Sequence, residues 1–259
     1  MARNAQSQAA EAQQQETPQT GRIHVGTSGW AYKAWQPDFY PEKLAQTKFL
    51  QHYATQLNTV EVNYTFRHLL TEKTIENWLK QTPENFQFVV KASQRITHIK
   101  RLKDVDDALG RFLSSVAPLA SAGRLGPILF QLPPNMKAVP EVLDNFLTLL
   151  PRTLRAAFEF RHQSWFAPEI EEILRRHEAA LCVAESDDFV TPEVVTAPFV
   201  YFRFRCSEYP EAVRAKLLER VVKVLEGGKE VFAFFKHEER PDGALWAREL
   251  LTSVQLPPA

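Results

Sequence analysis

The chain has 259 residues, of which 44% are apolar and 18 are Phe, so it is long enough to bury the core of one large domain. Its 31 basic and 31 acidic residues cancel, which excludes the global positive field that recruits nucleic acid through net charge. Two cysteines are too few for a disulfide scaffold and favour a reduced, cytoplasmic compartment. No apolar run is long enough for a membrane span, so no membrane partner is predicted.

The two ends of the chain differ in composition from the part between them. Residues 1–21 are rich in Ala and Gln and hold hardly any large apolar side chain, which predicts a disordered tail. They contain no apolar segment of the kind that a secretory signal needs. Residues 255–259 are predicted to be a second tail, and residues 22–254 form the predicted domain.

Short strand-like runs alternate with helical periodicity along this domain. The predicted strands cover residues 23–26, 59–63, 86–91, 127–131, 155–161, 180–184, 199–205 and 230–236. The predicted helices cover residues 43–56, 71–80, about 104–122, 140–150, 168–177, 209–226 and 243–254. Prolines interrupt residues 186–198, so a turn is expected to replace one helix after the sixth strand.

Eight strands that alternate with helices in a chain of this length predict an α/β fold, a single TIM-like (β/α)8 barrel. An open, doubly wound sheet is the alternative. No G-x-G-x-x-G motif follows the first strand, as the dinucleotide-binding form of that sheet would require, and this favours the barrel.

Alternate residues of a barrel strand face the lumen, and the others face the helices. Because the helix-facing set must be apolar, the polar residues of the strands turn inward. In strand 155–161, Phe158 and Phe160 face outward, so Glu159 and Arg161 face inward. The inner ring predicted in this way consists of Glu61, Asn63, Lys91, Gln131, Glu159, Arg161, Arg203, Arg205 and Lys236, with His162 and His237 near the mouth.

The predicted ring holds five cations but two carboxylates. Buried cations without counter-ions are costly, so the ring is expected either to be hydrated or to bind an anion. A ligand that carries a phosphate or a carboxylate fits this surplus. The alternative to anion binding is that any single carboxylate–cation pair of the ring belongs to an internal ion-pair network that only fills the lumen.

The ring predicts one function and leaves two others open. In the first, the protein is a hydrolase or acid/base enzyme for a phosphorylated or otherwise anionic small molecule or nucleotide, with Glu159, His162 and Glu61 as catalytic residues. The cations, together with Asn63 and Gln131, bind the substrate and stabilise developing charge. The alternatives are a nucleic-acid-binding or nucleic-acid-processing barrel and a non-catalytic metabolite-binding protein.

A basic loop follows the third strand, because residues 91–103 contain no acidic residue. The loop includes His98 and favours phosphate binding beside the mouth, although a solvated loop is the commoner state of such a run. Trp30 and Trp165 are predicted to stack a ring or a base, with packing beneath the mouth loops as the alternative. No histidine spacing predicts a metal site, and no motif identifies a cofactor.

Residues 25–30, 59–63, 130–134 and 159–165 read VGTSGW, TVEVN, FQLPP and EFRHQSW. In combination these motifs resemble the YecE-like family, which is also called domain of unknown function 72. The resemblance covers residues 23–254 and implies a TIM-like barrel, but it implies no reaction. The sequences RFR at 203–205 and FFKHE at 234–238 resemble a branch of the family with a more cationic pocket.

Overall fold

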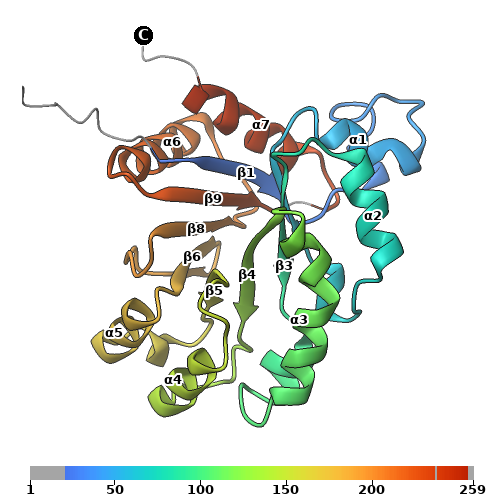
Figure 1. The fold of residues 1–259 in the computed structure, drawn as a ribbon. Helices are drawn as coiled ribbons and strands as arrows, with labels where there is room; N and C mark the ends of the chain where they lie inside the picture. Colours follow the sequence, from blue (N-terminus) through green and yellow to red (C-terminus); the bar gives the residue numbers. More distant parts are fainter. Residues whose placement is uncertain (1–20, 237, 256–259) are drawn as a thin grey trace, which may run out of the picture.

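The structure is a computed structural model and describes residues 21–236 and 238–255. Its parallel strands are β1 Ile23–Thr27, β2 Thr59–Val62, β3 Gln87–Lys91, β4 Leu125–Gln131, β5 Ala156–Glu159, β6 Ala180–Ser186, β8 Phe199–Phe204 and β9 Glu230–Phe235. They lie in the order β1, β9, β8, β6, β5, β4, β3, β2 and form a nearly closed barrel (Figure 1). The predicted TIM-like architecture is therefore confirmed.

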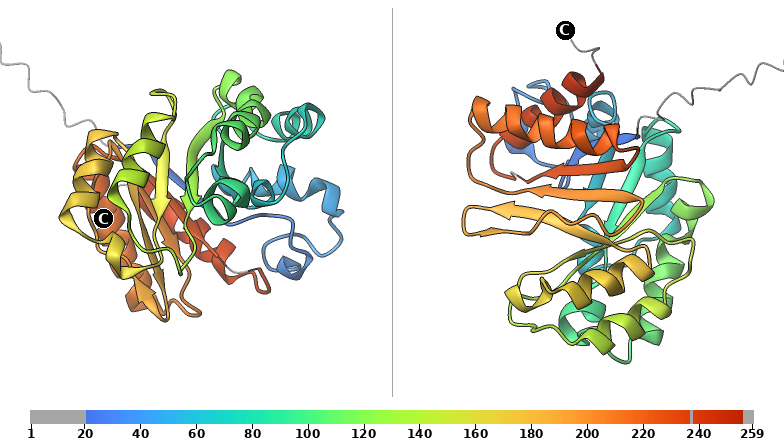
Figure 2. Two further views of the ribbon diagram at one scale, coloured as in Figure 1. Left: turned by 90° about the horizontal axis from the view of Figure 1, so that it is seen from below. Right: turned by 90° about the vertical axis from the view of Figure 1, so that its left-hand side faces the viewer.

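Helices cover the outside of the barrel (Figures 1 and 2). They are α1 Phe49–Tyr53, α2 Glu72–Gln81, α3 Asp106–Ser121, α4 Pro140–Thr148, α5 Pro168–Arg176, α6 Glu211–Glu226 and α7 Asp242–Gln255. The predicted helix 43–56 is shorter, because residues 45–48 are exposed and have no apolar face to bury. After the sixth strand the predicted turn is confirmed, since the two-residue strand β7 (Phe189–Val190) pairs antiparallel with β6 in place of a helix.

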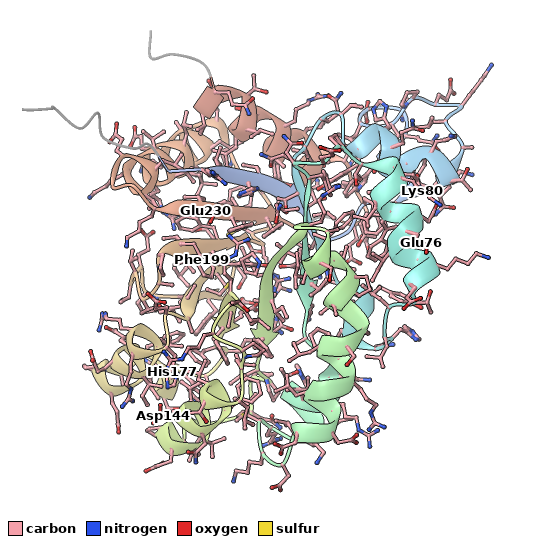
Figure 3. The ribbon with its side chains drawn as sticks, in the orientation of Figure 1. Glu76, Lys80, Asp144, His177, Phe199 and Glu230 are labelled. Carbon is pink, nitrogen blue, oxygen red and sulfur yellow. The ribbon has the colours of Figure 1, made fainter. Side chains whose placement is uncertain are left out.

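Local sequence determines where several helices begin. Thr71 caps α2, because its side-chain oxygen accepts a hydrogen bond from the Thr74 backbone N–H at 3.2 Å. Both α4 and α5 begin with a proline, at a position where no backbone N–H is needed. His177 and Asp144, 2.7 Å apart, then link the end of α5 to α4 (Figure 3).

Two apolar layers hold the barrel together. The outer layer lies between the strands and the helices and includes Val60, Val62 and Phe158. The inner layer fills the lumen with Val89, Leu129, Ala157, Cys182, Tyr201, Phe232 and Phe234. Several strands continue past these inner residues, and the next residue on the same face, two positions later, is polar. The lumen therefore changes from apolar to polar toward the carboxyl ends of the strands.

The barrel closes between β1 and β2. A parallel bridge joins Ser28 to Glu61 at the carboxyl ends of the two strands. Nearer the middle, the Tyr53 hydroxyl accepts a hydrogen bond from the Thr27 backbone N–H at 2.8 Å and donates one to the Thr59 carbonyl at 2.9 Å. A buried side chain thus connects two strands whose backbones are joined by few direct hydrogen bonds.

The two predicted tails lie almost entirely outside the described residues, so they stay predictions. At the described ends, the Gly21 backbone N–H donates to the Leu225 carbonyl at 3.0 Å, and α7 extends to Gln255. None of the helices in the described ranges combines the length and the apolar character needed to cross a membrane.

Candidate functional site

Charged side chains meet inside the barrel near the carboxyl ends of the strands. Glu61 comes from β2, Glu159 from β5 and Arg203 from β8, and their exposed fractions are 0%, 1% and 2%. Alternate residues of each strand point into the lumen, and Glu61, Glu159 and Arg203 each belong to this inward-pointing set. The three side chains therefore lie together in one layer of the lumen. Residues far apart in the sequence thus form one buried cluster.

Arg203 joins the two carboxylates. Its Nη2 lies 2.6 Å from Glu61 Oε1, and its Nη1 contacts Glu159 Oε2. Burial is the largest single effect and opposes ionisation of both carboxyls, but Arg203 and the other groups that contact them together outweigh burial, so the pKa of Glu61 and the pKa of Glu159 lie below the usual value. The internal ion-pair alternative therefore describes these three residues.

Neutral donors complete the coordination of both carboxylates. Ser28 Oγ and the Tyr201 hydroxyl donate to Glu61 at 2.8 and 2.7 Å, and Gln131 Nε2 donates to Glu159 at 2.9 Å. Ser28 and Tyr201 were not among the predicted site residues. The alternation of the seventh predicted strand contains the signal for Tyr201, and the same parity continued two residues past the first predicted strand, 23–26, gives it for Ser28.

Two arginines lie nearer the mouth and share one oxygen of the buried cluster. Arg161 Nε donates to Glu159 Oε1 at 2.9 Å, and Arg205 Nη1 reaches the same oxygen at 3.4 Å. Their side chains are 31% and 25% exposed, whereas the side chain of Glu159 is buried. Each guanidinium therefore contacts the buried carboxylate on one side and remains accessible to a ligand on the other.

Lys91 is the third cation at the mouth and ends β3. Its Nζ donates a hydrogen bond to Gln131 Oε1 at 2.7 Å and lies 4.3 Å from the centre of the Phe66 ring. Burial and then repulsion from Arg203 lower the pKa of Lys91 to about 8. Phe66 belongs to a 3₁₀ turn after β2, and no periodicity in the sequence indicates its contact with Lys91.

His98 lies in a π-helical turn, Arg95–Ile99, within the predicted basic loop. Its ring centre is 4.9 Å from that of Phe66, so Phe66 borders both His98 and Lys91. Burial and then the nearby cations, Lys91 first among them, lower the pKa of His98. The imidazole is therefore neutral at neutral pH.

Two predicted site residues on the segment after β5 have structural roles. His162 caps the turn Gln163–Trp165, because its Nδ1 accepts a hydrogen bond from the Ser164 backbone N–H at 3.2 Å. Trp165 is 1% exposed, stacks on Phe160 with ring centres 4.5 Å apart, and donates its ring N–H to a backbone carbonyl. The prediction that Trp165 stacks a ligand is corrected, because neither face of its ring is open.

The residues after β9 contribute less to the cluster than the sequence suggests. Lys236 Nζ lies 3.5 Å from Glu238 Oε1, and the two side chains are 36% and 47% exposed. His237 lies outside the described residues. No three His, Cys, Asp or Glu side chains within residues 21–236 and 238–255 are arranged to hold a metal ion.

Trp30 and Asn63 line a mostly apolar cleft beside the polar cluster. The cleft has a volume of about 340 Å³ and is also lined by Tyr32, Tyr64, Thr74 and Trp78. The Trp30 and Trp78 rings meet edge to face at 5.3 Å. The Tyr32 hydroxyl donates to the Ser28 carbonyl at 2.9 Å, so one wall of the cleft touches a residue that also contacts Glu61.

A larger cavity of about 580 Å³ lies at the opposite end of the barrel, near the start of β9, where Glu230 is labelled in Figure 3. Three of its polar groups contact one another. Arg155 Nη1 and His24 Nε2 lie 2.7 and 2.9 Å from Glu230. This cavity is remote from the cluster around Arg203, so we place the candidate site at the carboxyl-end mouth despite the smaller volume there.

Comparison with known sequences gives a family and no reaction. Residues 24–259 match the model of a family described as a protein of unknown function, DUF72. The UPF0759 protein YunF of Bacillus subtilis (strain 168) is 31% identical over 156 residues, which cover 58% of this chain and 54% of that protein. The UPF0759 protein YecE of Escherichia coli (strain K12) is 32% identical over 152 residues, which cover 58% of this chain and 52% of that protein. The chain thus spans about half the length of the curated relatives it matches.

Solved structures agree with the barrel. A DUF72 family protein from Thermotoga maritima MSB8 superimposes with a TM-score of 0.81 at 28% identity, covering 91% of this chain and 100% of that one. A DUF72 family protein from Enterococcus faecalis V583 gives a TM-score of 0.74 at 22% identity, covering 92% and 100%, and supports the fold alone.

Proposed function

The chain belongs to the DUF72 family, and from that premise we propose that it is an enzyme for a phosphorylated or otherwise anionic small molecule or nucleotide. The substrate binds at the carboxyl-end mouth of the barrel, where Lys91, Arg161 and Arg205 surround the buried cluster. The family description names no reaction, so the proposal depends on the chemistry of these side chains.

A surplus of positive charge at the mouth is the observation that carries the proposal. Both buried carboxylates are paired with Arg203. Arg161 and Arg205 share one oxygen of Glu159, and Lys91 makes no ion pair with a carboxylate in the described part of the chain. An anion bound between the two guanidinium groups accepts charge-assisted hydrogen bonds from both and offsets this surplus.

His98 is the best-placed general base beside these cations. A neutral imidazole accepts protons at neutral pH, and the lowered pKa of His98 keeps it in that form. The Thr97 hydroxyl lies 2.9 Å from His98 Nδ1, which leaves Nε2 to take a proton from water or substrate. Negative charge that develops on the substrate is stabilised by the neighbouring cations.

Catalysis by Glu159 stays a prediction, and its surroundings favour a positioning role. A carboxylate whose pKa is lowered by Arg203 and neighbouring arginines carries no proton to donate at neutral pH and is a weak base. Its oxygens are already engaged by Arg203, Arg161, Arg205 and Gln131. We assign Glu159 the task of orienting the two arginines that contact the anion.

The cleft beside Trp30 supports a substrate with a second, apolar part. Its aromatic walls suit a planar or apolar group, such as a nucleotide base, and its Tyr32 wall is linked to the cluster through Ser28. A substrate with an anionic end at Arg161 and an apolar end in the cleft therefore uses both features of the mouth.

Binding of inorganic pyrophosphate to the purified full chain tests the anion site. We expect Arg161→Gln and Arg205→Gln each to raise the Kd at least about tenfold, because hydrogen bonds to charged groups contribute about 1.5–3 kcal/mol. Titration calorimetry measures the Kd. Arg111→Gln, which alters an exposed arginine on α3, is the control and should leave the Kd unchanged. Failure to bind pyrophosphate, or equal weakening in all three variants, contradicts the proposed site.

Turnover distinguishes an enzyme from the non-catalytic metabolite-binding alternative. A panel of phosphate monoesters and diesters is incubated with the protein, and release of phosphate from the monoesters and of alcohol from the diesters is followed. For a substrate found in this way, His98→Gln should lower kcat about 10²–10⁴-fold, the usual contribution of a general base, while the Kd for pyrophosphate stays similar. Ligand binding without turnover of any panel member would support the metabolite-binding alternative.

A further inference from the structure

Lys91 differs from the arginines around it in its partners. Arg161, Arg203 and Arg205 each contact a carboxylate, whereas Lys91 makes no such contact among the residues described. Its amine donates to the neutral amide oxygen of Gln131 and lies over an aromatic ring. The side chain is half-buried at the carboxyl end of β3, so a reactant at the mouth can reach the amine.

Burial, followed by repulsion from Arg203, disfavours the protonated form of Lys91. Arg203 and Arg161 repel the ammonium, and Glu61 and Glu159 attract it. Both carboxylates are already paired with Arg203, and burial adds the largest effect, so the pKa of Lys91 falls to about 8. At that pH about half of Lys91 is a neutral amine, whereas an ordinary lysine with a pKa of about 10.4 is almost fully protonated.

We propose that Lys91 is a nucleophile that forms an imine with an aldehyde or ketone that carries a phosphate or carboxylate group. A lysine freed from its proton by burial and by a neighbouring cation is suited to this chemistry. The inference rests on the proposed function, because Arg161 and Arg205 hold the anionic group of the same substrate. Lys91 lies close to these arginines, because Gln131 accepts a hydrogen bond from Lys91 Nζ at 2.7 Å and donates one at 2.9 Å to Glu159, the carboxylate that Arg161 and Arg205 contact.

The reaction balances without an oxidant or a reductant. The lone pair of Lys91 Nζ forms a bond to the carbonyl carbon, and the π electrons of the C=O bond move to oxygen. One amine proton passes to that oxygen to give a carbinolamine. The hydroxyl then leaves as water with the second amine proton, and a C=N bond remains. His98, which borders Phe66 together with Lys91, carries these protons between nitrogen and oxygen.

Borohydride trapping on the purified full chain tests this inference. Dihydroxyacetone phosphate and pyruvate are used as separate probes, and borohydride reduces any imine to a stable secondary amine. We expect intact mass spectrometry to show one adduct per chain and peptide mapping to place it on Lys91. The yield should rise as the pH is raised through about 8. Uncharged dihydroxyacetone should give at least about tenfold less adduct, because the arginines cannot hold it.

Two lysine variants make the test specific. Lys91→Arg keeps the charge but removes the nucleophile and should lose the adduct, whereas Lys80→Arg, which alters an exposed lysine on α2, should keep it. An adduct spread over exposed lysines, or undiminished in Lys91→Arg, overturns the inference. Should circular dichroism show that Lys91→Arg is unfolded, the peptide map of the wild-type adduct decides alone.

Pyrophosphate binding separates this inference from the function on which it rests. Pyrophosphate binding without any trapped imine refutes the imine and leaves the anion site intact. Efficient trapping of uncharged dihydroxyacetone on Lys91, without pyrophosphate binding, supports the nucleophile and refutes the anion site.

Discussion

Arg203 is the side chain on which the buried cluster depends, because it contacts both carboxylates. Without it, Glu61 and Glu159 would be buried charges lacking their main counter-ion, which is far more costly than the loss of a surface pair. Glu159 in turn holds Arg161 and Arg205 at the mouth. Stability and the proposed ligand binding therefore depend on the same few residues.

Glu159→Gln is expected to lower the free energy of unfolding by about 3–5 kcal/mol at neutral pH, because three arginines lose a shared carboxylate. The pKa of Glu159 in the folded protein lies below its ordinary value of 4.5. Its ionised form therefore stabilises the fold above pH 4.5, and this contribution is lost as the pH falls through the folded value. Urea unfolding should show the difference between wild type and variant shrinking as the pH is lowered below 4.5.

A matched substitution on the surface is the control for this measurement. Glu171 pairs with Arg175 at 3.0 Å on α5, where the two side chains are 24% and 43% exposed. Glu171→Gln should change the free energy of unfolding by less than about 0.5 kcal/mol at every pH. A difference between wild type and Glu159→Gln that does not vary with pH would contradict the ion pairing of Glu159.

At the scale of elements, the seam between β1 and β2 is closed partly by side chains. Asn58 Oδ1 accepts from the Val25 backbone N–H at 2.8 Å, and Asn58 Nδ2 donates to the Ile23 carbonyl at 2.9 Å. One amide side chain thus satisfies a donor and an acceptor on β1, as a neighbouring strand would. The two strands approach closely at the residue that follows Val25, which is Gly26.

Gly26→Ala is expected to destabilise the barrel by about 3 kcal/mol or more, because overpacking forces the backbones apart. A β carbon at this position would lie 2.1 Å from the Thr59 carbonyl oxygen. Gly110 in α3 is the control, since a β carbon there meets no described atom within 4 Å. Gly110→Ala should raise the free energy of unfolding by up to about 1 kcal/mol through helix propensity. Equal effects of the two changes on thermal unfolding would contradict close packing at the seam.

The π-helical turn and the loop after it hold His98 at the mouth. Arg101, Leu102 and Asp104 follow, with backbone φ angles of 50°, 66° and 49°. Residues other than glycine adopt such positive φ angles at a cost of about 1–3 kcal/mol each. Leu102 is buried, so packing offsets part of this cost. Strained backbone beside a π-helical turn is typical of functional sites and is consistent with the proposed role of His98.

For the whole molecule, the distribution of charge matters more than its sum. The acidic and basic residues are equal in number, yet cations outnumber carboxylates around Arg161, Arg205 and Lys91. A neutral protein lacks the long-range field that attracts a polyanion, whereas a local surplus of cations suits a compact anion. The charge distribution therefore favours a small ligand over nucleic acid.

The local surplus of cations in a chain without net charge predicts that pyrophosphate binds at a salt concentration of about 0.15 M, whereas a random single-stranded oligonucleotide does not. Fluorescence anisotropy of a labelled oligonucleotide over a range of salt concentrations provides the measurement. Tight binding at low salt, with a steep fall in log K against log salt concentration, would instead favour the nucleic-acid-binding alternative.

The sequence by itself determined the barrel and the inward direction of the polar residues. Both depend on local patterns, since the two-residue repeat of a strand requires one apolar face and thereby places Glu61, Glu159 and Arg203 on the other. The prolines after the sixth strand likewise indicated the missing helix. The long helix predicted at 43–56 was wrong in its first half, because residues 45–48 are exposed and have no apolar face that would anchor a helix there.

The tertiary structure alone decided which charges meet and which surfaces stay open. The register of strands remote in sequence decides which cations of the ring have a carboxylate partner. That register places Arg203 between both carboxylates, and it leaves Lys91 hydrogen-bonded to a neutral amide. Whether Trp165 was open to a ligand depended on the packing of its loop, which buries it against Phe160. Both outcomes arise from contacts between distant segments, which short-range patterns in a single sequence do not specify.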